Sequence, residues 1–228
     1  QDISNARKEL TELRKKVARA LIADNVTGAL VQVKHAPSMS DLTPVTKQYR
    51  RLHHMVKAVT QIPDRVLASF REDEGDTVSV YLKSRQQKLR IRDVKDRRIH
   101  VMVPIQRGRM QGEIGRTYSL DDISDREKYR RVATENTPTA WFLRGLIALR
   151  GAQHTTAEKC LKKADVPLAG TLLSELKAVA AARHEADAAE AFKAMISGLG
   201  LRAAPTLLPK LIEHRRLDNH DVRRYKTA

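Results

Sequence analysis

The basic residues between Thr77 and Ser119 are the side chains in this 228-residue chain whose spacing best suggests a ligand. Eleven Lys and Arg stand there against three acidic residues. Lys88, Arg90 and Arg92 alternate with apolar residues, so an extended strand would carry them on one face about 6.5–7 Å apart. That is close to the spacing of successive phosphates, and phosphate contact needs positive charge along a line. The candidate residues for binding an anion or a nucleic acid are Lys88, Arg90, Arg92, Arg97, Arg98, Arg107 and Arg109.

The same basic stretch has two other interpretations. A charged outer sheet face is often only solvated, and its charges keep the sheet edges from aggregating. It can also dock an acidic protein or anionic lipid headgroups. Aromatic residues make up only 4% of the chain, and Tyr81 alone is suited to stacking on single-stranded nucleic acid. The three interpretations stay open at this point.

The residues that usually carry catalysis or bind metals do not converge in the sequence. His53 and His54 point about 100° apart on a helix, and the motif His-Glu-x-x-His is absent. The single cysteine, Cys160, excludes an internal disulfide and any multi-cysteine metal site. The carboxylates of residues 72–76 have the pattern of a solvated turn. We therefore expect a protein that is not an enzyme and that holds no metal and no cofactor.

An alternating pattern predicts strands in the basic stretch. Residues 77–83, 88–92 and 99–103 alternate apolar and polar positions, and residues 113–118 form a shorter fourth segment. Tight turns between short strands are typical of a meander that closes on itself. Residues 71–120 are therefore predicted to form a small antiparallel β-barrel of the SH3-like or Sm-like size. The residues predicted to lie buried together are Val78, Val80, Leu82, Leu89, Ile91, Ile99, Val101 and Val103.

The chain before the barrel has helical periodicity. Leu10, Val17 and Leu21 lie on one apolar stripe of a first helix, and a short second helix follows near residues 29–33. Residues 35–44 have loop composition, and a third helix is predicted over residues 45–61. Pro63 interrupts it before one or two further turns. Residues 1–70 are thus expected to be a helical segment.

The chain after the barrel is also predicted to be helical, over residues 121–228. Ser124 and Glu127 have capping-box spacing at the start of a helix. Helices are expected over residues 141–150 and 155–164, and residues 168–198 are expected to hold two helices that meet near His184. Two more are predicted at 207–216 and 219–226. The fold class predicted for the whole chain is α+β.

Five residues of this C-terminal region resemble the tetratricopeptide repeat. Its pattern has a Trp, a Gly four residues later, and two Ala flanking a large apolar residue in the second helix. The matching residues are Trp141, Gly145, Ala157, Leu161 and Ala164. The resemblance implies two antiparallel helices with Trp141 buried between them. Arg144 and Ala148 depart from the pattern, and a second match at Ala188, Phe192 and Met195 comes 31 residues later rather than 34. An ordinary helical hairpin packed through small residues is the alternative.

The order of helical segment, basic barrel and repeat-like helices resembles the non-catalytic accessory region of large bacterial serine/threonine protein kinases. The resemblance is carried by that layout and by residues 62–70 and 119–127. The chain has no glycine-rich loop before a strand lysine, no His-Arg-Asp and no Asp-Phe-Gly. The resemblance implies a module without kinase chemistry of its own.

Composition limits the remaining function classes. The net charge is +16, and 41% hydrophobic residues are enough for a packed core. The longest nearly apolar stretch, residues 139–149, is too short to cross a bilayer. Because the first residue is Gln, we expect a piece of a longer protein. The sequence predicts a non-enzymatic interaction or scaffolding module of a larger bacterial signalling or assembly protein. Its expected partner is a protein; nucleic-acid binding through the basic barrel is the alternative.

Overall fold

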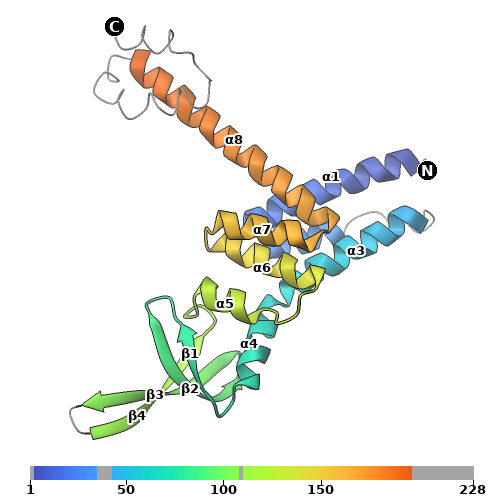
Figure 1. Cartoon of the computed structure of the whole chain (residues 1–228). Coiled ribbons are helices and arrows are strands. Elements are labelled where there is room, and N and C mark those ends of the chain that lie inside the picture. The colour runs from blue at the N-terminus through green and yellow to red at the C-terminus, as the bar shows by residue number, and fades with distance from the viewer. Residues whose placement is uncertain (1–2, 35–42, 108–109, 197–228) are drawn as a thin grey trace. The chain divides into compact units, whose positions relative to one another are not determined.

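The computed structural model describes residues 3–34, 43–107 and 110–196. Eight α-helices and one four-stranded antiparallel sheet lie in those ranges, so the predicted α+β class is confirmed (Figure 1). The chain divides into two compact units, Gln1–Leu173 and Ser174–Ala228. The sheet and seven of the helices belong to the first unit. The helices predicted at 207–216 and 219–226 lie outside the described residues.

Four helices precede the sheet: α1 (Ile3–Ile22), α2 (Val26–Lys34), α3 (Thr43–Thr60) and α4 (Ile62–Glu72). The apolar stripe of α1 buries Leu10, Val17 and Leu21, as its period predicts. The Asn25 side chain caps α2, because its Oδ1 accepts a hydrogen bond from the Gly28 N–H at 2.7 Å. A Cβ at position 28 would lie only 2.5 Å from the Asn25 side chain, so this cap favours glycine there.

The sheet consists of β1 (Thr77–Tyr81), β2 (Gln86–Lys95), β3 (Arg98–Arg107) and β4 (Met110–Ser119), in that spatial order. All neighbours are antiparallel, as the alternating pattern predicted. Seven of the eight predicted inner residues are buried, and Val78 is half-buried. The period-2 pattern therefore identified the core face of the sheet correctly.

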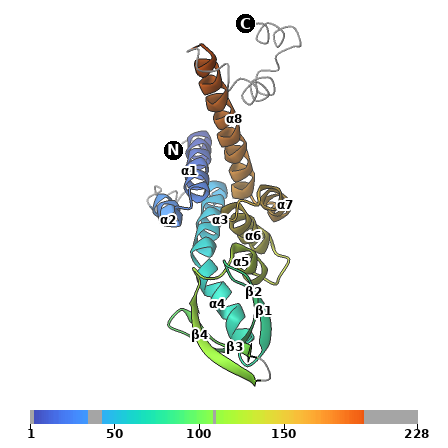
Figure 2. The same ribbon diagram turned by 90° about the vertical axis from the view of Figure 1, so that its left-hand side faces the viewer.

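The prediction of a closed barrel is wrong, because β1 and β4 are the two open edges of the sheet. Helix α4 packs on β2 and β3 and supplies the apolar cover that closure would have given (Figure 2). Phe70 of α4 is fully buried. The segment after β4 runs along β1, where Ile123 bridges to Leu82 and the Ser124 N–H donates to the Tyr81 carbonyl at 3.0 Å. With one face covered and one edge partly occupied, the sheet stays open.

Four helices follow the sheet: α5 (Asp125–Arg131), α6 (Pro138–Arg150), α7 (His154–Ala164) and α8 (Pro167–Ile196). Ser124 caps α5 through a hydrogen bond from the Glu127 N–H to its Oγ at 3.3 Å. The other hydrogen bond of the predicted capping box, from the Ser124 N–H to the Glu127 carboxylate, does not form, because the Ser124 N–H donates to Tyr81. The Glu127 carboxylate accepts from the Tyr81 N–H of β1 at 3.2 Å and so joins α5 to the sheet.

Helices α6 and α7 form the predicted hairpin, packed through a small residue. Gly145 is buried, and a Cβ there would lie 2.8 Å from Leu161 Cγ. Ala157, Leu161 and Ala164 are buried on the facing side of α7. The burial predicted for Trp141 between the helices is only partial. Trp141 is only half-buried, with Lys163 Nζ 4.5 Å from its ring centroid, and its neighbour Phe142 fills the core instead.

Helix α8 runs without interruption from Pro167 to Ile196, so the prediction of two helices meeting near His184 is wrong. The sequence around His184 contains good helix formers and no Gly or Pro, and nothing in it ends a helix. Ala188, Phe192 and Met195, the second repeat match, lie in this helix, but their side chains are outside the described set.

Candidate functional site: a fork between two strand pairs

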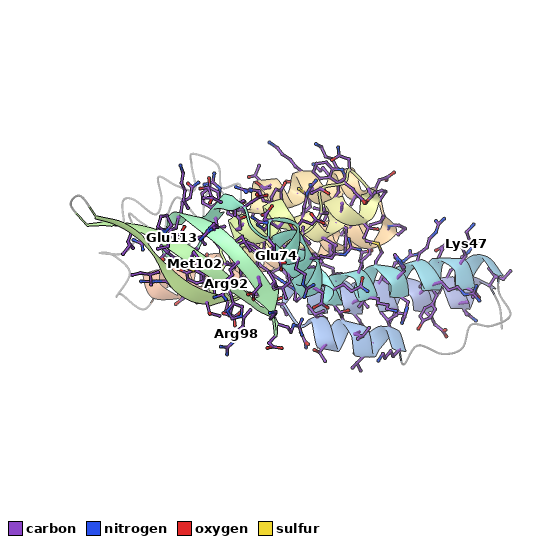
Figure 3. The ribbon with its side chains drawn as sticks, turned by 90° about the horizontal axis from the view of Figure 1, so that it is seen from below. Lys47, Glu74, Arg92, Arg98, Met102 and Glu113 are labelled. Carbon is purple, nitrogen blue, oxygen red and sulfur yellow. The ribbon has the colours of Figure 1, made fainter. Side chains whose placement is uncertain are left out.

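The predicted line of cations on β2 is partly neutralised. Arg90 forms an ion pair with Glu113 of β4, reaching across β3, where Met102 is its register partner. Figure 3 shows Met102 between Glu113 and Arg92 on this face. The outer face of the sheet therefore carries a carboxylate as well as guanidinium groups, and Arg90 is not available as a free cation.

The regular spacing also ends at Arg92, because the β2–β3 register shifts between Ile91 and Asp93. Glu74, one of the carboxylates predicted to be solvated, bonds near this bulge: its Oε1 accepts from the Val94 N–H at 3.0 Å. Arg92 is 73% exposed, with its Nε 3.9 Å from Asp93 Oδ2. Since the alternation is broken, Lys88, Arg90 and Arg92 do not continue as one evenly spaced row.

The remaining predicted site residues are spread along the β2–β3 and β3–β4 hairpins. Arg97 is in the β2–β3 turn and pairs with Asp64 of α4 at 3.0 Å. Arg98 begins β3 and is exposed. Arg107 ends β3, but its side chain is not among those described, and Arg109 lies outside the described residues. Lys88 is at the other end of β2 from Arg97 and Arg98, so the structure does not gather the predicted set into one site.

The structure does bring another group of residues together, where β2 and β3 separate. Their pairing runs from Lys95 opposite Arg98 to Arg90 opposite Met102 and goes no further. Beyond that point β2 stays paired with β1 as far as Gln86, and β3 stays paired with β4 as far as Arg107. The two hairpins diverge in Figure 1. We call the space between Gln86–Leu89 and Val103–Ile105 the strand fork.

The strand fork forms an open groove with a volume of about 460 Å³, called the fork cavity below. Val103, Ile105 and Ile114 form its apolar wall. Val103 is buried, whereas Ile105 is 36% and Ile114 46% exposed. Isoleucines this exposed are unusual for an inner sheet face, and here that face extends beyond the cover of α4. The fork thus offers apolar side chains next to strand segments that have lost their neighbour.

Gln87 of β2 has an unsatisfied polar atom at the fork. Its Oε1 is buried and has no hydrogen-bond partner among the described residues. Buried carbonyl oxygens are nearly always paired, because an unpaired one costs about 1–3 kcal/mol. The neighbouring Gln86 is satisfied, since its Nε2 donates to Ser79 Oγ at 2.8 Å. Gln87 Oε1 is therefore a buried acceptor beside the fork to which no described residue donates.

The charge lining the fork is positive. Arg85, Lys88 and Arg116 line the cavity, and its described lining residues include no carboxylate. All three side chains are exposed, and none forms an ion pair with a described acidic residue. An anionic group entering the fork therefore meets cations that no described carboxylate neutralises.

Sequence reasoning identified Lys88 but missed most of the strand fork. Arg85 and Arg116 counted only toward the total charge, and Gln87, Ile105 and Ile114 were not considered. One signal was present: the alternation of Val101 and Val103 continues to Ile105, which makes β3 longer on its apolar face than a short barrel strand needs. Neither strand's own sequence indicates the point where β2 and β3 separate.

The part of the chain that the structure describes holds neither a metal cluster nor a membrane-spanning helix. No group of three or more His, Cys, Asp or Glu there is arranged to hold a metal ion. None of the described helices is long and apolar enough to cross a membrane. Comparison with protein-family models, curated proteins and solved structures gave no match for this chain.

Proposed function

We propose that this chain is a non-enzymatic interaction module that binds an extended, acidic segment of a partner protein in the strand fork. The observation that carries the proposal is the end of β2–β3 pairing at Arg90 and Met102, beside an apolar wall and three exposed cations that form no ion pair with a described residue. The proposal combines the protein partner expected from the sequence with the acidic-protein interpretation that the sequence left open, and assigns it to a specific surface.

An extended segment suits the fork because strand edges bind strands. Main-chain hydrogen bonds to an exposed edge give affinity, and alternate side chains give specificity. In an extended partner, successive side chains point to opposite sides. Apolar side chains would contact Ile105 and Ile114, while acidic ones would lie on the opposite side near Lys88. Arg116 is on the same face of β4 as Ile114 and would add to the positive potential around the segment.

Nucleic-acid binding is the second candidate, and the net charge of +16 favours it. The ion pairs of Arg90 with Glu113 and of Arg97 with Asp64 weigh against it, because they remove cations from the predicted path. The fork wall is also aliphatic, whereas bases stack best on aromatic side chains. An acidic protein segment is therefore the better fit.

The rest of the chain fits a scaffolding role. The α6–α7 hairpin packs closely through Gly145 and Leu161, as paired helices of repeat proteins do. Tetratricopeptide-like pairing, an SH3-like relationship of the sheet, and a place in a larger bacterial signalling or assembly protein are parts of this proposal. They rest on the sequence pattern and the layout.

The proposal is tested with a labelled eight-residue peptide that alternates Val and Asp, measured by fluorescence anisotropy. We expect it to bind, and a peptide that alternates Val and Lys not to bind. The double change Lys88→Gln and Arg116→Gln should weaken binding about two- to thirtyfold, since exposed ion pairs contribute ~0.2–1 kcal/mol each. Ile114→Ala should weaken it further through the lost apolar contact.

The matched control is Lys95→Gln with Arg98→Gln, which removes two exposed cations at the other end of β2 and β3. This control should bind the acidic peptide like the wild type. If it weakens binding as much as the fork variant, attraction is nonspecific and the fork is not the site. Duplex DNA bound tighter than ~100 μM, with a salt slope reduced by two to three units in Lys88→Gln/Arg90→Gln/Arg92→Gln, would favour the nucleic-acid candidate.

A further inference from the structure

A second cavity lies in the helical part of the first unit, away from the strand fork. It has a volume of about 290 Å³ and is lined by α1, α3, the start of α6 and the connection from α7 to α8. Leu52, Met55 and Leu168 give it an apolar interior, and each of the three is buried. Arg14 of α1 and Arg51 of α3 are also on the lining. A pocket that is mainly apolar with a few convergent polar groups has the character of a small-molecule site.

Arg14 is the unusual member of this lining. Its Nη2 donates a hydrogen bond to Gln48 Oε1 at 2.7 Å, and Gln48 is neutral. Among the described residues no carboxylate forms an ion pair with Arg14, although Asp165 also lies on the lining. Partial burial lowers the pKa of the Arg14 guanidinium, and no nearby charge compensates. An arginine keeps its proton in proteins, so Arg14 is a partly desolvated cation that no described carboxylate pairs with.

The volume of the cavity limits the size of an anion that could pair with Arg14. At roughly 30 Å³ for each water-sized group, the cavity has room for about ten non-hydrogen atoms. Arg14 and Arg51 would bind an anionic head group, and Leu52, Met55 and Leu168 would pack against an apolar chain. A guanidinium binds a carboxylate with two parallel hydrogen bonds, which a single hydroxyl does not provide.

We propose that this cavity binds a small amphiphilic carboxylate, with the head on Arg14 and the chain against Leu52, Met55 and Leu168. The site uses other residues than the strand fork and does not rest on the proposed function.

The proposal is tested by methyl NMR on the full chain with ¹³C-methyl methionine. The Met55 resonance is assigned from Met55→Leu, and Met102, on the sheet, serves as the internal control. Sodium octanoate should shift the Met55 methyl saturably, with a Kd of about 1 mM or tighter for a ligand of this size. The Met102 methyl should not move. An unmoved Met55 methyl at ~10 mM octanoate, well above that Kd, would overturn the proposal.

In the wild-type protein, a comparison with octanol distinguishes the contribution of the carboxylate head to binding from that of the alkyl chain. Octanol should bind at least about tenfold more weakly than octanoate, because its neutral hydroxyl does not pair with the Arg14 guanidinium as a carboxylate does. Equal binding of the two would overturn the role of Arg14. Arg14→Gln should weaken octanoate about tenfold or more, whereas Lys16→Gln, an exposed cation of the same helix, should leave it unchanged. Octanoate binding that is indifferent to Arg14→Gln would also count against the site. The octanol comparison holds even if that variant does not fold.

Discussion

Glu127 Oε1 lies 2.6 Å from Arg131 Nε in the interior of the first unit. Glu127 is fully buried, and Arg131 is 7% exposed. The second Glu127 oxygen accepts from the Tyr81 N–H, while Arg131 Nη1 lies 2.7 Å from Asp73 Oδ2 and donates to Ser69. One ion pair on α5 thus holds β1 on one side and the end of α4 on the other.

Breaking this pair should be strongly destabilising. Glu127→Gln removes the negative charge closest to Arg131 while Asp73 still pairs with it, and we expect a loss of about 1.5–3 kcal/mol in the free energy of unfolding. Urea unfolding followed by circular dichroism measures it. Glu158→Gln is the matched control, because Glu158 pairs with Lys162 at the same i,i+4 spacing but in solvent, and it should cost under ~0.5 kcal/mol. A loss below ~1 kcal/mol for Glu127→Gln would contradict the structural role of the pair.

Two glycines in helices should respond to alanine in opposite directions. At Gly145 a Cβ would meet Leu161 at 2.8 Å, and overpacking there should cost about 1–3 kcal/mol. At Gly170 of α8 a Cβ would meet nothing within 4 Å, so Gly170→Ala should stabilise by about 0.5–1 kcal/mol through helix propensity. Thermal unfolding of both variants checks this. A Gly145→Ala protein as stable as the wild type would mean that α6 and α7 are not in close contact.

Alanine substitutions at Trp141 and Phe142 should also differ in how much they lower the free energy of unfolding. Trp141 is half-buried and lies beneath Arg144 and Lys163, so Trp141→Ala should cost about 1–2 kcal/mol. Phe142 is fully buried, and Phe142→Ala should cost about 3–5 kcal/mol. The order of the two losses in chemical denaturation is the result to compare. The reverse order would restore the burial of Trp141 that the repeat pattern predicted.

The turn between β2 and β3 carries backbone strain. Asp96 and Arg97 both have positive φ, 49° and 59°, which a two-residue hairpin turn of this kind requires and which Asn-Gly adopts best. Replacing the pair with Asn-Gly should stabilise by about 0.5–1 kcal/mol, even though the exposed Arg97–Asp64 ion pair is lost. Gly75→Ala is the converse experiment. Its φ of 90° makes alanine destabilising despite the open space around it.

Asp122 should make stability depend on pH at the acidic end. Its Oδ2 accepts from the Ser119 N–H at 2.7 Å and the Ser119 hydroxyl at 2.8 Å, and these bonds lower the pKa of the carboxyl. A lowered folded-state pKa contributes stability above the unfolded value of ~3.9, and that contribution is lost as pH falls through the folded value. The stability difference between wild type and Asp122→Asn should therefore shrink below about pH 4. A difference that stays constant from neutral pH to pH 3 would contradict this.

Local patterns predicted the elements of this fold well, and they failed where the outcome depended on distant contacts. The alternation around Leu89 and Ile91 identified both the strand and its buried side. Whether the sheet closed depended on what covered it, and the cover is α4, whose own sequence indicates only an amphipathic helix. Trp141 shows the same limit, since it is only half-buried while its neighbour Phe142 is fully buried.

The strand fork was beyond prediction for a related reason. A strand's sequence states which of its faces is apolar, but not how far along its length a neighbour follows it. Arg90 is an ordinary alternating cation in sequence, yet it is the last β2 residue paired to β3 and is neutralised by Glu113, 23 residues away. The bulge after Ile91 broke the even row of charges for the same reason, because it arises from pairing between strands.

The bond between Arg131 and Ser69 joins residues 62 positions apart, and all four strands lie between them. The sheet is therefore inserted between two helices, α4 and α5, that contact each other through Ser69 and Arg131. Closing a loop of that length costs roughly 3–4 kcal/mol of chain entropy before the contact is made. The neighbouring strands of the sheet and the α6–α7 pair close much shorter loops. During folding the two hairpins of the sheet can thus form early and independently, and the ion pair on α5 joins the helices on either side of them as a late event.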